Sequence, residues 1–191
     1  MLDPGMLKEA FYHRAVALLG QVGARYGGAL AKGVKPEEAW RSVQVDQHSA
    51  ALAHSLSTLV ANFLDAAASP PFPGVLPERD GGVLQKLATL FALDQMQGVS
   101  ADLLESGFMH PTRHPPLLRA AIRTLLHELR GDAVALVDAF DFSDNQLKST
   151  LGRYDGEAYR ALFASAQREP LNAEEPVFCL DALRRATRPK L

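Results

Sequence analysis

Residues 117–140 read LLRAAIRTLLHELRGDAVALVDAF and contain the longest helical pattern of the sequence. Apolar side chains recur there at alternating steps of three and four residues: Leu118, Ile122, Leu125, Leu129, Ala133, Leu136 and Phe140. This spacing places them on one face of an α-helix. Gly131 lowers the local helix propensity by about 1 kcal/mol relative to alanine, but the pattern stays in phase across it. We therefore predict one continuous helix.

The same periodicity extends over most of the chain, and no alternating strand pattern interrupts it. Further helices are expected to begin at Asp3-Pro4, at Pro36-Glu37-Glu38 (continuing to Phe63), near Gly82, around Asp144 and at Glu157. Prolines and glycine in residues 69–74 predict a loop between helices, near 69–81, rather than a domain boundary. The predicted fold class is all-α, an antiparallel helical bundle formed by a single domain over residues 1–191.

Composition narrows the classes of function. The chain has 47% hydrophobic and 22% charged residues and a formal net charge of −2, which excludes disorder throughout and gives no bulk electrostatic reason to bind nucleic acid. No apolar run approaches the ~20 residues of a membrane span. The single cysteine, Cys179, lies in an apolar stretch and predicts a buried, inert thiol in a reducing compartment.

Metal binding and covalent catalysis have little support in the residues. His110 and His114 are four residues apart, but Pro111, Pro115 and Pro116 make that stretch a loop, so helical spacing does not bring the two imidazoles together. The sequence has no serine on a glycine-flanked elbow and no phosphate-binding loop. A small metal-dependent enzyme would need a third ligand to converge with this pair. The residues alone predict only a helical bundle.

Two segments carry a resemblance to a known family. Asp132 to Phe142 (DAVALVDAFDF), followed by Leu151 to Gly156 (LGRYDG), resembles the C-terminal signature of acyl-CoA oxidases. Weaker similarity at Leu7–Ala15, Glu38-Ala39-Trp40 and Leu87–Leu93 is collinear with the same domain, so it covers nearly the whole chain.

The signature residues also have a physical interpretation. Val134, Leu136, Val137 and Phe140 are expected at the inward end of the long helix, as part of the core. Asp138 would then be buried and need a partner, for which Arg153 is the natural candidate. Asp155 can cap the helix predicted from Glu157.

Those residues are expected to shape a corner or an interface. Gly152 and Gly156 lie at the two ends of the segment Arg153-Tyr154-Asp155, and glycine permits backbone angles there that other residues avoid. The signature residues to which we assign a structural or interface role are Asp132, Asp138, Phe140, Gly152, Arg153, Tyr154, Asp155 and Gly156.

The resemblance implies an FAD-dependent enzyme of fatty-acid β-oxidation that converts an acyl-CoA to the trans-2-enoyl-CoA and reduces O2 to H2O2. In the family, a glutamate removes the α-proton, and that glutamate and most flavin contacts lie in segments with no counterpart here. We therefore assign no catalytic residue. The implied partners are the remaining oxidase domains, a second subunit in a homodimer and, for the parent enzyme, fatty acyl-CoA. The alternative is a free-standing helical interaction module without activity.

The last three residues, Pro189-Lys190-Leu191, resemble the peroxisomal address Ser-Lys-Leu. Lys190 and Leu191 match it and Pro189 does not. With the family resemblance, this predicts a peroxisomal protein; without the signal, a cytoplasmic one is expected.

Overall fold

The computed structural model describes residues 3–69, 77–173 and 179–187, and every regular element within these ranges is a helix. The predicted all-α fold class is confirmed. Contacts divide the chain into two compact units, unit 1 (Met1–Ala133) and unit 2 (Val134–Leu191), which we describe separately. None of the described helices is both long and apolar enough to cross a membrane.

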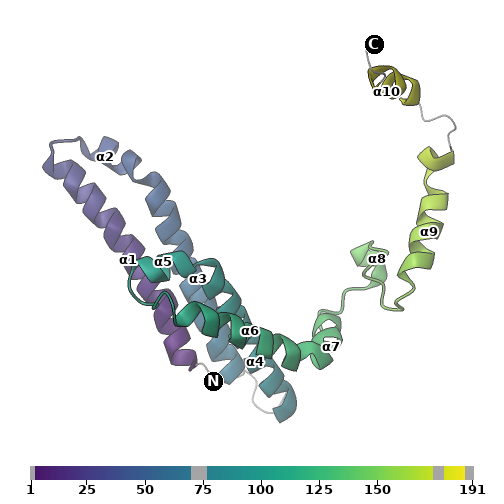
Figure 1. The fold of residues 1–191 in the computed structure, drawn as a ribbon, viewed down its shortest axis with the longest axis horizontal. Helices are drawn as coiled ribbons and strands as arrows, with labels where there is room; N and C mark the ends of the chain where they lie inside the picture. Colours follow the sequence, from purple (N-terminus) through teal and green to yellow (C-terminus); the bar gives the residue numbers. More distant parts are fainter. Residues whose placement is uncertain (1–2, 70–76, 174–178, 188–191) are drawn as a thin grey trace. The chain divides into compact units, whose positions relative to one another are not determined.

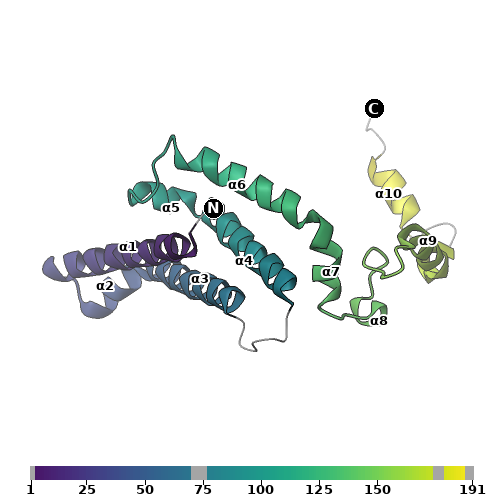
Figure 2. The same ribbon diagram turned by 90° about the horizontal axis from the view of Figure 1, so that it is seen from below.

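Unit 1 is a helical bundle (Figures 1 and 2). Its long helices pack in chain order, with α1 against α3, α3 against α4 and α4 against α6. The short helices α2 and α5 join them, and a 3-10 turn, η1, follows α6. The bounds are α1 Pro4–Ala31, α2 Pro36–Ser42, α3 Gln44–Ala68, α4 Glu78–Gly98, α5 Ser100–Glu105, α6 His114–Leu129 and η1 Arg130–Asp132.

Local chemistry explains how α1 begins and ends. Asp3 is its N-cap, and a carboxylate oxygen of Asp3 accepts the backbone N–H of Met6 at 3.3 Å. Pro4 occupies the first helical position, where no N–H is needed. The helix ends at Ala31, and Gly33 follows with φ +81°, a conformation that favours glycine. The start predicted at Asp3-Pro4 is confirmed.

Two other predicted boundaries were wrong. The helix expected from Pro36 to Phe63 is broken at Val43, whose buried side chain packs with Val22 and Ala50 while its backbone leaves the helical conformation. The next helix begins at Glu78 rather than near Gly82, because acidic residues in its first turn favour an N-terminus there. Residues 70–76 of the predicted loop lie outside the described residues.

The main core lies where α1, α3, α4 and α6 meet and is closed by α5. Leu7, Phe11, Val60, Leu93 and Leu103 are its largest fully buried side chains. Each contributes about 1.5–3 kcal/mol by leaving water. A smaller separate cluster of Val22, Val43 and Ala50 lies farther along the α1–α3 hairpin. That part of the hairpin is only two helices thick.

The continuous helix predicted across Gly131 was wrong. The α-helical hydrogen bonding of α6 stops at Leu129, η1 covers Arg130–Asp132, and α7 (Ala133–Asp138) follows. Glycine has a lower helix propensity than other residues except proline. The α-helix therefore gives way at Gly131 to the tighter 3-10 turn. The boundary between the two units falls just after this turn.

Unit 2 contains short helices connected by turns. After α7 come α8 (Asp144–Leu147), α9 (Ala158–Arg168), the 3-10 turn η2 (Pro170–Ala173) and α10 (Leu180–Thr187). The buried hydrophobic residues of the described chain all belong to unit 1, the last of them being Leu129. Unit 2 therefore has no buried apolar core among its described residues.

The buried core of unit 1 should limit its stability. Replacing Leu93, which is fully buried on α4, by alanine is expected to lower the free energy of unfolding by about 2–5 kcal/mol, through lost transfer energy and the cavity left behind. Urea unfolding followed by circular dichroism measures this. Leu117→Ala on α6, where the side chain is 58% exposed, is the control and should change it by only about 0.5 kcal/mol. Equal losses for the two variants would contradict the assigned core.

Candidate functional site

The signature residues form a corner in unit 2, between α7 and α9. Asp138, Phe140, Gly152 and Tyr154 line a shallow cavity of about 190 Å³. Its other lining residues are Val137, Asp141, Phe142, Asp144 and Leu147. Asp132 lies apart from these in unit 1, where its carboxylate pairs with the Arg79 guanidinium at 3.3 Å. The structure thus gathers part of the predicted set into one place.

The corner is held by short-range polar contacts. Ser143 and Gln146 form a capping box at the start of α8. A carboxylate oxygen of Asp144 accepts the backbone N–H of Tyr154 at 3.0 Å, which connects residues ten positions apart. At the end of α8, Lys148 adopts a left-handed conformation with φ +48°. These bonds fix the loop geometry without a hydrophobic core.

Arg153 and Asp155 form an ion pair with two hydrogen bonds at this corner. The Arg153 Nε donates to Asp155 Oδ1 at 3.0 Å, and Nη2 donates to Oδ2. Asp155 Oδ1 also accepts the backbone N–H of Glu157 at 3.0 Å. The pKa of Asp155 lies below its ordinary value. The largest cause is the side-chain hydrogen bond from Arg153, and the second is the hydrogen bond from the backbone N–H of Glu157, because both stabilise the charged carboxylate. The same pairing with Asp155 raises the pKa of Arg153.

Two predicted roles in this segment were wrong. Asp138 is exposed on α7, and the hydrogen-bond partner of Arg153 is Asp155 instead, two residues away. The expected inward face is also exposed: Val134 by 72%, Val137 by 69% and Phe140 by 73%. Because the helix breaks before these residues, they do not continue the buried stripe of α6. Asp155 does accept an N–H at the predicted helix start, and α9 begins one residue later, at Ala158.

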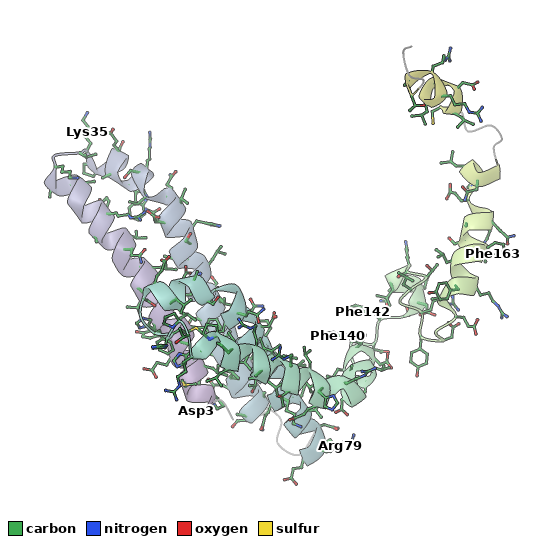
Figure 3. The ribbon with its side chains drawn as sticks, in the orientation of Figure 1. Asp3, Lys35, Arg79, Phe140, Phe142 and Phe163 are labelled. Atoms are coloured by element: carbon green, nitrogen blue, oxygen red, sulfur yellow. The ribbon has the colours of Figure 1, made fainter. Side chains whose placement is uncertain are left out.

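The most distinctive property of the corner is its exposed aromatic surface. The rings of Phe140 and Phe142, two residues labelled in Figure 3, are stacked, with centroids 6.3 Å apart and an interplanar angle of 6°. Tyr154 is 84% exposed, and Phe163 on α9 is 66% exposed. The carboxylates of Asp138 and Asp141 line the cavity beside these rings, so the exposed surface combines aromatic rings with acidic groups. Such a surface is suited to packing against another protein surface.

Unit 1 has an apolar groove that we did not predict. It lies between α1 and α3 and has a volume of about 740 Å³. Trp40 of α2 also lines it, and its ring meets that of Tyr26 edge-on, with the ring centroids 5.6 Å apart. The groove is lined by Tyr12, Ala15, Val16, Leu19, Val22, Gly23, Tyr26, Trp40, Gln47, Ala50, Ala51 and His54. The signal available in the sequence was a second apolar stripe on the first helix.

The described grooves do not fit the diphosphate of FAD. The α1–α3 groove has no lysine or arginine in its lining. A second groove in unit 1, of about 630 Å³, contains Lys86, but the Lys86 Nζ is already paired with a Glu128 carboxylate oxygen at 2.9 Å. A diphosphate needs several free cationic or N–H donors. We therefore assign no flavin contact to these residues.

Each imidazole of the histidine pair has a polar contact at its Nδ1 atom. The backbone N–H of His110 donates to His114 Nδ1 at 3.0 Å, and Thr112 Oγ1 lies 3.2 Å from His110 Nδ1. No group of three or more potential metal ligands occurs in residues 3–69, 77–173 and 179–187. Within these ranges the third ligand required by the metal hypothesis is therefore absent. Cys179 is half-buried rather than fully buried.

Comparison with known proteins gives consistent matches over most of the chain. The family model described as "Acyl-CoA oxidase" matches residues 3–185. Peroxisomal acyl-coenzyme A oxidase 2 of Rattus norvegicus is 34% identical over 172 residues, 90% of this chain and 24% of that protein. Peroxisomal acyl-coenzyme A oxidase 1 of Arabidopsis thaliana is 32% identical over 171 residues, 90% of this chain and 24% of that protein.

Solved structures agree with the sequence matches. Acyl-CoA oxidase-1 of Caenorhabditis elegans has 27% identity and a TM-score of 0.80, covering 94% of this chain and 27% of that one. Arabidopsis thaliana acyl-CoA oxidase 1 has 27% identity and a TM-score of 0.79, covering 96% and 27%. One structure of the Caenorhabditis elegans protein is complexed with FAD and ATP. The chain thus spans about a quarter of the length of the relatives it matches.

The Arg153–Asp155 pair predicts a specific titration. Because the folded-state pKa of Asp155 is lowered, the stabilisation from the pair is present at neutral pH and is lost as the pH falls through that pKa. Arg153→Met should raise the pKa of Asp155 toward the ordinary value of about 3.9, as measured by NMR titration of its carboxyl carbon. Arg160→Met is the control. The Arg160 Nε lies 3.9 Å from Glu157 Oε2 and forms no hydrogen bond with Asp155. An unchanged pKa in Arg153→Met would contradict the pairing.

Proposed function

Because this chain belongs to the acyl-CoA oxidase family, we propose that it is the C-terminal helical domain of a peroxisomal, FAD-dependent acyl-CoA oxidase. Its role is to supply packing and interface surface to the enzyme. The proposal covers residues 1–191 as one domain, within which units 1 and 2 are the parts described above.

The observation that supports this proposal is the exposed apolar surface of unit 2. Phe140, Phe142, Tyr154 and Phe163 are all more than half exposed, and no described residue of the unit is buried. Large aromatic side chains gain free energy by leaving water, so such a surface is expected to be covered in the working protein. The remaining domains of the oxidase, which account for about three quarters of each relative, are the natural cover.

Within the proposal, the signature residues have a structural or interface role. Gly152, Arg153, Asp155 and Gly156 keep the corner in shape, and Asp138, Phe140 and Tyr154 present its surface. Asp132 has the corresponding role in unit 1 by holding Arg79. No residue of this chain is assigned to catalysis.

The parent enzyme would act in fatty-acid β-oxidation. It would convert a fatty acyl-CoA to the trans-2-enoyl-CoA and reduce O2 to H2O2, with FAD supplying the redox chemistry when bound. The catalytic base and most of the flavin site are proposed to lie in the rest of the oxidase. The assembly is proposed to be a homodimer.

Peroxisomal localisation is proposed from the family and from the last residues. The relatives are named peroxisomal acyl-coenzyme A oxidases. Pro189, Lys190 and Leu191 lie outside the described residues, so their role as an import signal stays a prediction.

A free-standing interaction module is the competing proposal. Such a module would have a mostly polar surface, with its large apolar side chains already buried within the chain. The exposed aromatic residues of unit 2 favour a part of a larger enzyme instead.

Two measurements test the proposed function. Incubation of this chain with FAD and a long-chain acyl-CoA should give no H2O2 above the level without protein. Mixing it with a separately expressed flavin-bearing segment of the parent oxidase, encoded by the same genome, should give a stable complex, and H2O2 should then appear. Robust turnover by the chain alone would contradict the assignment of the chemistry to other segments. If the genome encodes no such segment, the free-standing module is correct.

The surface of unit 2 should be needed for that complex. The double variant Phe140→Ser, Phe142→Ser is expected to weaken it by roughly tenfold or more, because two exposed aromatic rings would no longer be buried. Isothermal titration calorimetry measures the affinity. Leu117→Ser in unit 1, also an exposed apolar residue, is the matched control. Equal effects of the two changes would show that unit 2 does not form the interface.

A further inference from the structure

The corner between α7 and α9 presents two kinds of side chain toward one shallow cavity. Phe142 and Tyr154 are 61% and 84% exposed, and both line this cavity of about 190 Å³. Asp138 and Asp141 line it as well. The backbone N–H of Asp141 donates to the Asp138 carbonyl oxygen at 2.9 Å, so a tight turn places both acidic residues at the same end of α7. Aromatic rings and carboxylates therefore meet at one place.

The two carboxylates have no counter-ion in the part of the chain that the structure describes. Neither Asp138 nor Asp141 takes part in an ion pair among these residues. Arg153 is paired with Asp155 instead, and no lysine or arginine belongs to the described lining of the cavity. Asp144 adds a third carboxylate to the lining, although one of its oxygens already accepts a backbone N–H. Because neighbouring like charges repel, the surface favours a cation from outside.

The size of the cavity suits a single side chain rather than a free metabolite. Small-molecule pockets of proteins have volumes of about 300–1,000 Å³, whereas this cavity has about 190 Å³. Unit 2 also exposes apolar side chains outside the cavity, among them Phe163 on α9, and a free metabolite would leave these in water. A protein that covers unit 2 would shield both. The occupant is therefore a side chain of that protein.

Among cationic side chains, arginine matches this lining best. Its guanidinium is planar, so it can lie against an aromatic face while its N–H groups donate in pairs to a carboxylate. The lysine ammonium is a compact and strongly hydrated charge, which loses more by leaving water. Since rings and carboxylates line the same cavity, one guanidinium can contact both. Both contacts become stronger when the covering protein excludes water.

We infer that this corner binds an arginine side chain of the flavin-bearing segment of the oxidase. Its guanidinium lies against Phe142 and Tyr154 and pairs with the carboxylates of Asp138 and Asp141. This inference rests on the proposed function and gives its interface a charged anchor. Arginine and aromatic residues are enriched among the side chains that dominate binding energy in protein interfaces. A charged anchor also fixes the position of one surface on the other, which apolar contact alone does not.

A small arginine probe tests the inference on the full chain without any partner. N-acetyl-arginine-methylamide is titrated into the protein, and the ring protons of Phe142 and Tyr154 are followed by NMR. We expect saturable shifts with a dissociation constant of about 1–10 mM, as for a few weak contacts. N-acetyl-citrulline-methylamide has nearly the same shape without the charge, and should bind at least about tenfold more weakly. Equal binding of the two probes, or no binding of the arginine probe, would overturn the inference.

Two pairs of variants separate the carboxylates from the rings. Asp138→Asn combined with Asp141→Asn keeps the shape of both side chains and should reduce binding of the arginine probe to the level of the citrulline probe. Asp181→Asn is its control, because Asp181 lies on α10, outside the cavity lining. Phe142→Leu should weaken binding about two- to fivefold through loss of the ring face. Phe163→Leu, which also removes an exposed ring, should leave it unchanged. A variant that behaves like its control in either pair would overturn the inference.

The complex with the flavin-bearing segment provides the second test. Isothermal titration calorimetry at about 50 and about 300 mM NaCl should give a weaker affinity at the higher salt concentration, because salt screens a partly exposed ion pair. In the double variant Asp138→Asn, Asp141→Asn the affinity should fall roughly tenfold and lose most of its salt dependence. A double variant with wild-type affinity would overturn the inference while the complex still supports the proposed function. If no complex forms, the proposed function fails together with the partner named here, whereas binding of the arginine probe would still support the corner as an arginine-binding surface.

Discussion

The rest of unit 1 depends on the packing of α1 against α3. Leu7 and Phe11 on α1 and Val60 on α3 are essentially inaccessible to solvent, and α4 and α6 complete the cluster around them. An amphipathic helix must bury its apolar face somewhere, and here each long helix supplies a wall for the next. The part-buried pair between Arg14 and Asp102, at 2.6 Å, ties α5 to α1 at the edge of this core. The bundle is thus specified by burial first and by charge second.

Unit 2 is organised by a different kind of interaction. Its corner is defined by hydrogen bonds over short distances in the sequence, such as those of Asp144 and Asp155, and its large side chains point away from any core. Exposed hydrogen bonds contribute little net stability because water competes for them. The contrast explains why a chain with an ordinary composition can have one self-sufficient part and one that presents an apolar surface.

Sequence reasoning succeeded where the determining interactions were local. The start of α1 follows from the Asp3 cap and Pro4, and the all-α class follows from periodicity. It failed at Val43 and Gly131, where helices end because of tertiary packing or a weak backbone position inside a continuous pattern. The predicted partner of Arg153 was Asp138, because Asp138 was expected to be buried. Asp138 is exposed, and Arg153 donates to Asp155 instead. The family was recognisable from the segment between Asp132 and Gly156, but the exposure of Phe140 was not, because exposure depends on the tertiary contacts around a residue.

The neighbour-to-neighbour packing of unit 1 has a consequence for how the protein is made. Since α1 meets α3, α3 meets α4 and α4 meets α6, the most extensive helix contacts form between segments that follow closely in the chain, and such local contacts favour rapid folding. The ribosome releases the N-terminal part first, so this bundle can close while Val134 onward is still being synthesised. Unit 1 would then be folded before the exposed apolar surface of unit 2 leaves the ribosome. That surface would therefore spend less time beside unfolded chain, with which it could aggregate.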